Sequence, residues 1–200
     1  MGIGALILFI AMILVASIAA NVMIQTMNSL EEQALATSTE TIREVSGGLK
    51  VSQVSGYTNT TDITQMAIFV EPMSGVDQID LMHTFIVLTD TSTEVVLNYT
   101  TVAFNATITS GLFGTMDDTK LTSTKYGIMV IRDADSSISA TDPSLNEEDL
   151  VVLLVNTTAC FTGINTRTEV RGEVVPEYGA RGVISFVTPP SYINTIEELQ

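Results

Sequence analysis

The chain has 200 residues with 46% hydrophobic content, which is enough for one ordinary domain plus one special segment, or for two small domains. Its net charge of −15 argues against a nucleic-acid partner, which needs clustered Lys and Arg, and its single cysteine, Cys160, excludes an intrachain disulfide. All 8 basic and 23 acidic residues follow Leu30, so the chain joins two chemically different parts, and we expect Cys160 to be a buried apolar thiol in the second part.

The N-terminal segment is apolar and uncharged. Residues 3–20 read IGALILFIAMILVASIAA and lead into the uncharged stretch NVMIQTMNSL, so the segment is longer than the ~20 apolar residues that span a bilayer. A secretory signal peptide begins with a basic region, whereas the first basic residue here is Arg43. We therefore expect the segment to be retained in the mature chain, any basic leader having been removed before it.

The helical period of apolar residues continues beyond the first charges. Leu35, Ile42, Val45 and Leu49 extend the apolar stripe at steps of seven, three and four residues, and Gly47-Gly48 gives the first plausible helix end. The pattern predicts one helix of roughly 45 residues, about 70 Å long at the standard rise. Such a helix is too long to be buried in its own small domain.

Small residues interrupt the apolar run and would let the backbones of neighbouring helices approach closely. A single membrane anchor is the alternative, but an anchor offers no partner to the stripe beyond the membrane-length segment. We therefore predict that the helix packs against other helices. The residues expected to form that packing are Ile3, Leu6, Leu8, Phe9, Ile10, Met12, Ile13, Leu14, Val15, Ile18, Val22, Ile24, Leu35, Ile42 and Val45.

After Gly48 the sequence changes to short apolar runs rich in Val, Ile, Thr and Phe, which predict an all-β domain. The fold class is therefore α+β, with a helical segment over 1–56 followed by an immunoglobulin-like β-sandwich over 57–200. The polar alternation over 166–174 predicts an exposed or edge strand. The candidate strands are 50–54, 63–70, 84–88, 94–100, 104–109, 126–132, 150–156, 166–174 and 182–187.

Catalytic combinations of residues are scarce in this chain. His83 and Cys160 are its single histidine and cysteine, and His83 is expected to be a structural or surface residue. The sequence contains no Gly-rich phosphate loop, no CxxC and no HExxH. We predict that the protein is not an enzyme and requires no cofactor.

Two kinds of modification or ligand are predicted for the β domain. Asp117-Asp118 and the pair Asp133 and Asp135 supply clustered oxygen donors of the kind that Ca²⁺ or another divalent ion prefers, although neither group completes an EF-hand loop and solvated acidic turns are the alternative. Four Asn-x-Thr sequons could carry N-linked glycans if the protein reaches a glycosylating surface. Their asparagines are Asn59, Asn98, Asn105 and Asn156.

Both ends of the chain resemble the archaeal flagellins, or archaellins, which are type IV pilin-like filament subunits. The N-terminal resemblance lies in GIGALILFIAMILVASIAANVMIQT and extends to Tyr57. The C-terminal resemblance lies in YGIMVIRDADSS, DLVVLLVNTT, CFTGINTRTEVRGEVVPEYGARGVISFVTP and the terminal EELQ. Two long matches at the corresponding ends make the resemblance specific.

The resemblance implies a structural subunit of the archaellum, an extracellular filament rotated for swimming motility. It implies a membrane-bound precursor cut by a leader peptidase, so that Met1 lies at or near the mature N-terminus. It further implies a filament core of helices from Met1 to about Gly56, self-association into a homopolymer or with a related archaellin, and a motor with an assembly ATPase and a membrane platform protein. Some family members are N-glycosylated and some bind metal ions in the outer domain.

One position departs from the bacterial type IV pilins, which carry a glutamate at the fifth mature position. That position is Ala5 here, so no core carboxylate is available to pair with an incoming amino terminus, and cohesion would depend on apolar packing. An archaeal adhesion pilus subunit, or a membrane-anchored surface binding module, is the alternative function.

Overall fold

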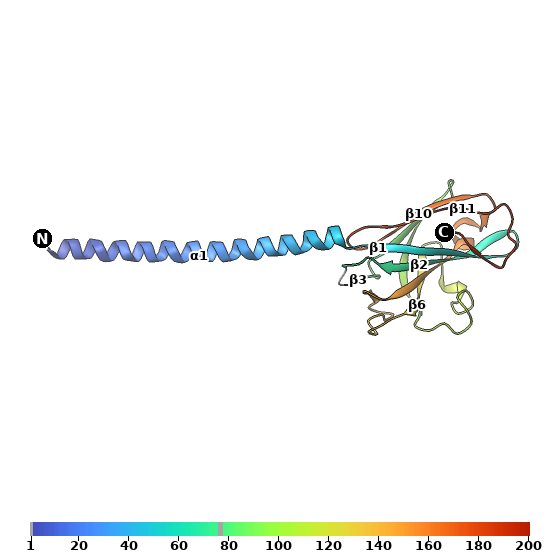
Figure 1. Cartoon of the computed structure of the whole chain (residues 1–200), viewed down its shortest axis with the longest axis horizontal. Coiled ribbons are helices and arrows are strands. Elements are labelled where there is room, and N and C mark those ends of the chain that lie inside the picture. Colours follow the sequence, from blue (N-terminus) through green and yellow to red (C-terminus); the bar gives the residue numbers. More distant parts are fainter. Residues whose placement is uncertain (1, 76–77) are drawn as a thin grey trace. The chain divides into compact units, whose positions relative to one another are not determined.

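The computed structural model describes residues 2–75 and 78–200; Met1, the predicted mature N-terminus, lies outside the described residues. The chain forms two compact units, the first ending at Ile42 and the second running from Arg43 to Gln200 (Figure 1). The second unit is called the head below.

Helix α1 (Gly2–Ser46) has 45 residues and ends directly before Gly47-Gly48, which confirms the predicted length and end. Its sequence contains no proline and is rich in Ala, Leu, Ile and Met, which suit a helix interior. The hydroxyl of Thr26 donates to the Val22 carbonyl at 3.1 Å, so this polar group is satisfied within the helix. By length and composition α1 could cross a membrane, since an 18-residue stretch of it has a mean hydropathy of 2.8.

The predicted boundary between residues 56 and 57 falls inside a strand. Strand β1 (Leu49–Thr58) begins three residues after α1 ends, so residues 49–56 belong to the sheet of the head and not to a helical segment. Leu49, which the sequence pattern placed on the helical stripe, is 1% exposed in the core of the head. The spacing of apolar residues could not show whether Leu49 belongs to the helix or to the strand. It lies four residues after Val45, so a buried strand residue at this position also fits the helical period.

The head is built from short strands. They are β1, β2 (Asp62–Pro72), β3 (Ile79–Asp80), β4 (Phe85–Thr89), β5 (Glu94–Asn105), β6 (Lys125–Arg132), β7 (Ser144–Leu145), β8 (Leu150–Asn156), β9 (Ile164–Asn165), β10 (Glu169–Val175), β11 (Gly182–Val187) and β12 (Ile196–Glu198). A 3₁₀ turn (Asp118–Lys120) and helix α2 (Thr157–Phe161) complete the described elements.

Most predicted strands are confirmed within a few residues, and β8 has the predicted bounds. The two strands predicted over 94–100 and 104–109 are a single strand, β5, whose pairing with β6 becomes irregular between Tyr99 and Phe104. Residues 106–109 lie beyond it. The short strands β3, β7, β9 and β12 and helix α2 were not predicted, because elements of two to five residues have no measurable periodicity.

The strands form one ten-stranded sheet in the order β11-β10-β4-β5-β6-β8-β2-β1-β12, with β9 added beside β2; β3 and β7 form a separate pair. Neighbouring strands are antiparallel except β5 and β6. The segment 166–174 was predicted to be an exposed or an edge strand, and the edge alternative is wrong, because β10 lies between β11 and β4. Its polar alternation instead reflects one exposed face, on which Arg171 lies.

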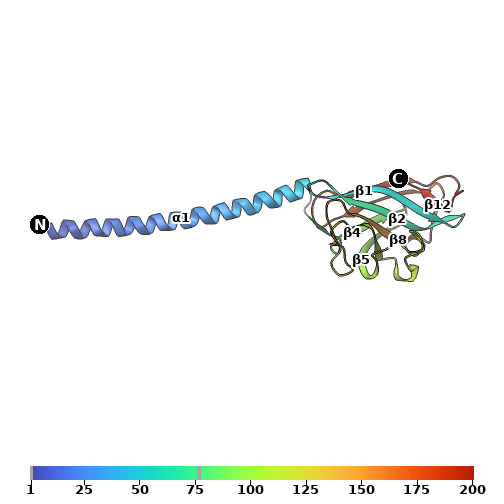
Figure 2. The ribbon, with the colours of Figure 1, turned by 60° about the horizontal axis from the view of Figure 1, so that its bottom comes forward.

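The two ends of the sheet meet, so that the sheet encloses the core as the layers of a sandwich do. The Leu49 amide donates to the Ala180 carbonyl at 3.0 Å, and the side chain of Gln200 accepts from the Ser185 amide of β11 at 2.8 Å. Figure 2 shows β1, β2 and β8 side by side near one end of the sheet. The predicted fold class, a long helix followed by a strand-rich domain, is confirmed.

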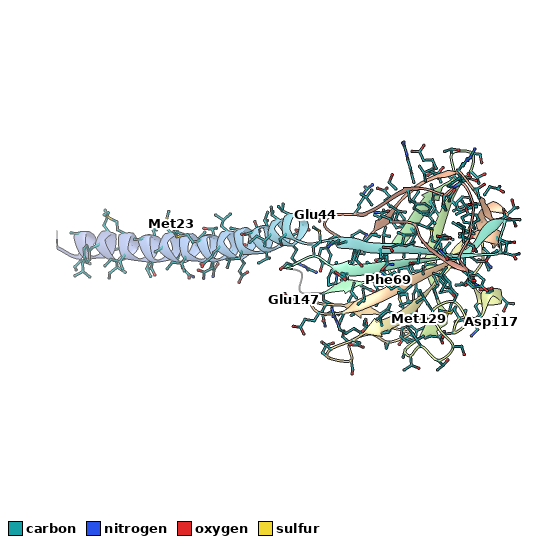
Figure 3. The ribbon with its side chains drawn as sticks, turned by 45° about the vertical axis from the view of Figure 1, so that its right-hand side comes forward. Met23, Glu44, Phe69, Asp117, Met129 and Glu147 are labelled. Carbon is teal, nitrogen blue, oxygen red and sulfur yellow. The ribbon has the colours of Figure 1, made fainter. Side chains whose placement is uncertain are left out.

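The enclosed core contains Tyr126, Ile128 and Leu153, each 0% exposed. A second apolar cluster lies on the outer face of β2, β6 and β8, where the segment 106–124 covers the sheet with Phe113, Met116 and Leu121. In Figure 3, Phe69 and Met129 mark the covered strands and Asp117 marks the covering segment. The head therefore buries apolar side chains on both faces of this part of its sheet.

Candidate functional site

The apolar surface of α1 is the largest exposed apolar feature of the described chain. Every predicted packing residue is exposed, from Ile10 at 49% to Ile3 and Val45 at 80%, and none of the helix's described residues is buried. A helix that is hydrophobic on all sides normally lies inside a larger assembly or a membrane. The sequence reasoning left out four further exposed apolar residues that the same composition indicates: Ile7, Met23, Met27 and Leu30.

Alanines in α1 leave a shallow apolar groove between larger side chains. The groove is lined by Leu8, Met12 and Val15, together with Ala11, Ala16 and Ala19. Helices pack by placing the side-chain ridge of one in the groove of another, and small residues allow the closest approach. This part of α1 can therefore accept the ridge of a neighbouring helix.

The last turn of α1 is held to the head by specific contacts. The Arg43 guanidinium lies 4.4 Å from the centre of the Tyr178 ring, and the Tyr178 hydroxyl donates to the Gln78 carbonyl. The Ala180 amide donates to the Gly47 carbonyl at 2.9 Å. This turn thus belongs to the compact head, in agreement with the division at Ile42 and Arg43.

The glycines of this junction permit close approach of two backbone segments. Gly179 has a φ of +84°, and a Cβ at that position would lie 2.3 Å from the Gly47 carbonyl oxygen. A Cβ on Gly48, with a φ of +147°, would lie 2.6 Å from the Ala180 amide nitrogen. Gly47-Gly48 is therefore packed against Gly179 and Ala180 within the second unit, where the close approach leaves no room for a side chain.

The side chains with catalytic potential have ordinary structural surroundings. His83 is exposed and its Nδ1 lies 2.8 Å from the Asp80 carboxylate. Burial raises the pKa of the Cys160 thiol to about 11, so it is protonated and unreactive at neutral pH. In the described part of the chain, the partner of His83 is the Asp80 carboxylate, and no serine, threonine or cysteine side chain hydrogen-bonds His83 as a nucleophile would.

The four sequon asparagines differ in their surroundings. Asn59 and Asn98 are exposed. Asn105 donates to the Thr115 carbonyl at 3.3 Å, and Asn156 caps α2 by accepting from the Ala159 amide at 3.0 Å. Glycosylation of Asn105 or Asn156 would therefore compete with structural hydrogen bonds, whereas Asn59 and Asn98 are free of such bonds in the described residues.

The two predicted acidic groups lie at opposite ends of β8. The Asn156 side chain, at the end of the strand, donates to the Asp118 carbonyl at 3.4 Å. Asp149 directly precedes the strand and lies with Asp133 and Asp135, one carboxylate oxygen of each falling within 4.8 Å of the others. The structure thus does not bring Asp117 and Asp118 together with Asp133 and Asp135, and it adds Asp149, which the sequence reasoning missed.

Each of the two groups already has hydrogen-bond donors of its own. Asp117 accepts from the Thr119 side chain at 2.7 Å, a bond that lowers its pKa. A hydrogen bond from Ser137 lowers the pKa of Asp135, and the Asp149 carboxylate accepts from the Ala134 amide at 3.0 Å. These bonds satisfy the carboxylates without an ion, and divalent ion binding by Asp117, Asp118, Asp133 and Asp135 stays a prediction.

Comparison with known proteins gives consistent matches along the chain. The family model of archaeal-type flagellins matches residues 1–186. Flagellin B2 of Methanocaldococcus jannaschii is 41% identical over 205 residues, covering 100% of this chain and 93% of that protein. Flagellin B4 of Pyrococcus abyssi is also 41% identical, over 212 residues, covering 100% of this chain and 97% of that protein.

Solved structures agree with the fold described above. The crystal structure of the archaeal flagellin FlaB1 from Methanocaldococcus jannaschii aligns with a TM-score of 0.68 at 33% identity, covering 77% of this chain and 97% of that chain. A subunit of the archaeal flagellum of Methanospirillum hungatei aligns with a TM-score of 0.65 at 15% identity, covering 100% of this chain and 98% of that chain. The second likeness shows that a long helix followed by a β-rich head is also the fold of that subunit.

Proposed function

Because the chain belongs to the archaeal-type flagellin family, we propose that it is a structural subunit of the archaeal flagellum filament, polymerising through α1 into a fibre that is rotated for swimming. The family is structural, in keeping with the prediction that the protein is not an enzyme. One observation carries the proposal: α1 exposes all its apolar side chains while the head is complete without it.

The physical basis of assembly is the cost of exposing α1 to water. Before assembly the helix lies in the membrane, where lipid covers its apolar surface, and in the filament the helices of neighbouring copies cover the same surface. Burying several hundred Å² of apolar helix per neighbour, at ~25 cal/mol per Å², contributes on the order of 10 kcal/mol before entropy costs. Such cohesion suits a fibre that must transmit torque.

Cohesion of the core is apolar and has no ionic contribution within the described N-terminal segment. Ala5 supplies no carboxylate, and residues 2–30 contain no charged side chain. Assembly in this scheme requires the homopolymer or a related archaellin, a leader peptidase, an assembly ATPase and a membrane platform protein. The mature filament is extracellular.

The head forms the outer wall in this proposal. The sequon asparagines whose side chains make no structural hydrogen bond then face the medium. We propose Asn59 as the first acceptor of an N-linked glycan, because it is exposed in a turn after β1. Asn98 is exposed too, but it lies within β5 on the surface of the sheet.

A charged substitution in α1 tests the proposal. Leu8→Arg or Leu14→Arg should abolish filaments, because an arginine in the helical core has no counter-ion there and its desolvation is costly. Leu8→Met, which keeps the apolar volume, is the matched control and should assemble. Electron cryomicroscopy of filaments sheared from cells is the measurement, and circular dichroism of the detergent-solubilised chain shows whether the head is folded.

Normal filaments from Leu8→Arg would contradict assembly through α1. If the wild-type chain were found as separate particles in membranes and never in filaments, the membrane-anchored module would be the correct interpretation. A tube of long helices inside and β-sandwich heads outside, with density that fits this sequence, would establish the filament function.

A further inference from the structure

Strands β11, β10, β4 and β5 present one outward face that no described segment covers; β10 and β11 are labelled in Figure 1. The register places Val183, Glu173, Val87 and Val96 in one row across the four strands. Val175 lies beside Phe85 in the next row. This outward face is called the neutral face below, and its apolar side chains are Phe85, Val87, Val96, Val175, Val183 and Val187.

The apolar side chains of the neutral face lie outside the core of the head. Val183 is 63% exposed and Val96 47%, while the alternate residues Ile86 and Val174 are fully buried on the inner face. On the other part of the sheet, the segment 106–124 covers the outer face of β2, β6 and β8. In the described residues, one outer apolar face is therefore covered by the chain and the other is exposed.

The charges on the neutral face balance. Arg171 lies 2.5 Å from Glu169, and Arg181 lies 2.8 Å from Glu173. Lys125, beside Asn98 at the border with β6, matches Glu94 at the far end of β5. Counted with Arg181, which directly precedes β11, and Lys125, the first residue of β6, the face and its border hold three acidic and three basic residues.

The remainder of the head is strongly acidic. Residues 43–200 contain 20 acidic and 8 basic residues. Removing the three acids and three bases of the neutral face and its border leaves 17 acids against 5 bases. On average, contact between other surfaces of identical heads brings negative charges together, which opposes close approach.

We propose that the neutral face is the surface by which each head contacts the head of a neighbouring copy in the filament wall. The inference rests on the proposed filament function. In a helical fibre a given face of one copy meets a different face of the next. One neutral, apolar face laid against an acidic surface therefore suffices to separate like charges, and its ion-paired rim around an apolar centre is the ordinary anatomy of a protein interface.

The sequon at Asn98 allows a test of whether a neighbouring head or a glycan covers the neutral face. It lies directly opposite Phe85 in the sheet, so a glycan at Asn98 would cover the apolar centre of the neutral face. The proposal requires Asn98 to be unmodified in filaments. Full glycan occupancy at Asn98, measured by mass spectrometry of peptides from purified filaments, would overturn the proposal and assign the face to the glycan.

The decisive experiment compares Val96→Glu with Val96→Lys in cells. Both variants lose the same apolar side chain, but only Glu places a negative charge against the acidic neighbour. We expect Val96→Glu to reduce filament yield about tenfold or more, with recovery in high salt, and Val96→Lys to reduce it much less. Val183→Glu and Val183→Lys, on the edge strand, should show the same asymmetry.

Equal losses from Glu and Lys, or normal filaments from both, would overturn the proposed contact. Circular dichroism of each full-length variant in detergent should match the wild type, because both positions are exposed and outside the core. Failure of the wild-type chain to form any filament would instead refute the underlying function, so the two failures are distinguishable.

Discussion

Helix α1 and the head use apolar residues in opposite ways. Up to Ile42 the chain exposes every large apolar side chain that the structure describes there, and the head encloses most of its own in two clusters. Two consecutive parts of one chain therefore differ in whether the chain itself covers their apolar side chains.

The difference teaches how one polypeptide can be stable as a subunit and still require assembly. The head gains its stability from burial within the chain, so it can fold before assembly. Up to Ile42 no described side chain of the helix is buried within the chain, so lipid or neighbouring copies must cover its apolar surface. Separate substitutions in the two regions should accordingly affect separate properties.

The same truncation in the two regions should give the largest contrast. Leu153 is fully buried between Ile68 and Ile128, and Leu153→Ala should lower the free energy of unfolding of the head by about 2 to 5 kcal/mol. Leu14→Ala removes the same atoms from a side chain that is 59% exposed and should leave that free energy unchanged. The measurement is denaturant unfolding in detergent, followed by tyrosine fluorescence, since the chain has no tryptophan.

The filaments should respond in the reverse order to this pair. Leu14→Ala removes packing in the core of the fibre and should lower the temperature at which filaments dissociate. If Leu14→Ala destabilised the solubilised subunit as much as Leu153→Ala does, α1 would have a partner within its own chain and the comparison would fail.

A smaller effect is expected within the head, where its first residues contact the segment around Gly179. Gly179→Ala forces a Cβ against the Gly47 carbonyl oxygen and should lower the free energy of unfolding of the head by about 2 kcal/mol or more. Gly111→Ala is the matched control, because Gly111 also has a positive φ, +78°, but no atom lies within 4 Å of an added Cβ. In that variant the free energy of unfolding should fall only by the cost of placing alanine at a positive φ, about 1 kcal/mol.

The difference between the two glycine variants measures the close approach alone. Equal losses would show that the contact between the Gly47 and Gly179 segments contributes nothing, and that the head begins after the glycine pair. A larger loss at Gly179 would place the start of the stable head at Arg43, before that pair.

Long periodic features of the sequence predicted the structure well. Forty-five residues of helical period before a glycine pair predicted α1, and the apolar run of β8 predicted its bounds, because each pattern repeats many times. Leu49 shows the limit: its spacing from Val45 fits a helix, but its position is set by pairing with Pro72 across the sheet.

Contacts between distant residues could not be predicted from the sequence. Asp149 joins Asp133 and Asp135 because β6 and β8 are paired, and nothing in the local sequence around 149 indicates that neighbour. The neutral face likewise depends on the register of four strands, which only the sheet order reveals. The polar pattern of β10 indicated an exposed strand and gave no sign of its interior place.

The smallest expected effect concerns the cap of helix α2. This helix has only 5 residues, and it is capped by Asn156 at its start and by Thr162, in the left-handed region, at its end. The long helix α1 has no acidic residue in its first turn. Asn156→Ala should lower the free energy of unfolding of the head by about 1 kcal/mol, and Asn156→Asp, which keeps the acceptor for the Ala159 amide, by less. Thermal unfolding of both variants checks the order. An equal loss from Asp and Ala would show that the bond from Asn156 to the Asp118 carbonyl, which only the amide can make, matters more than the cap.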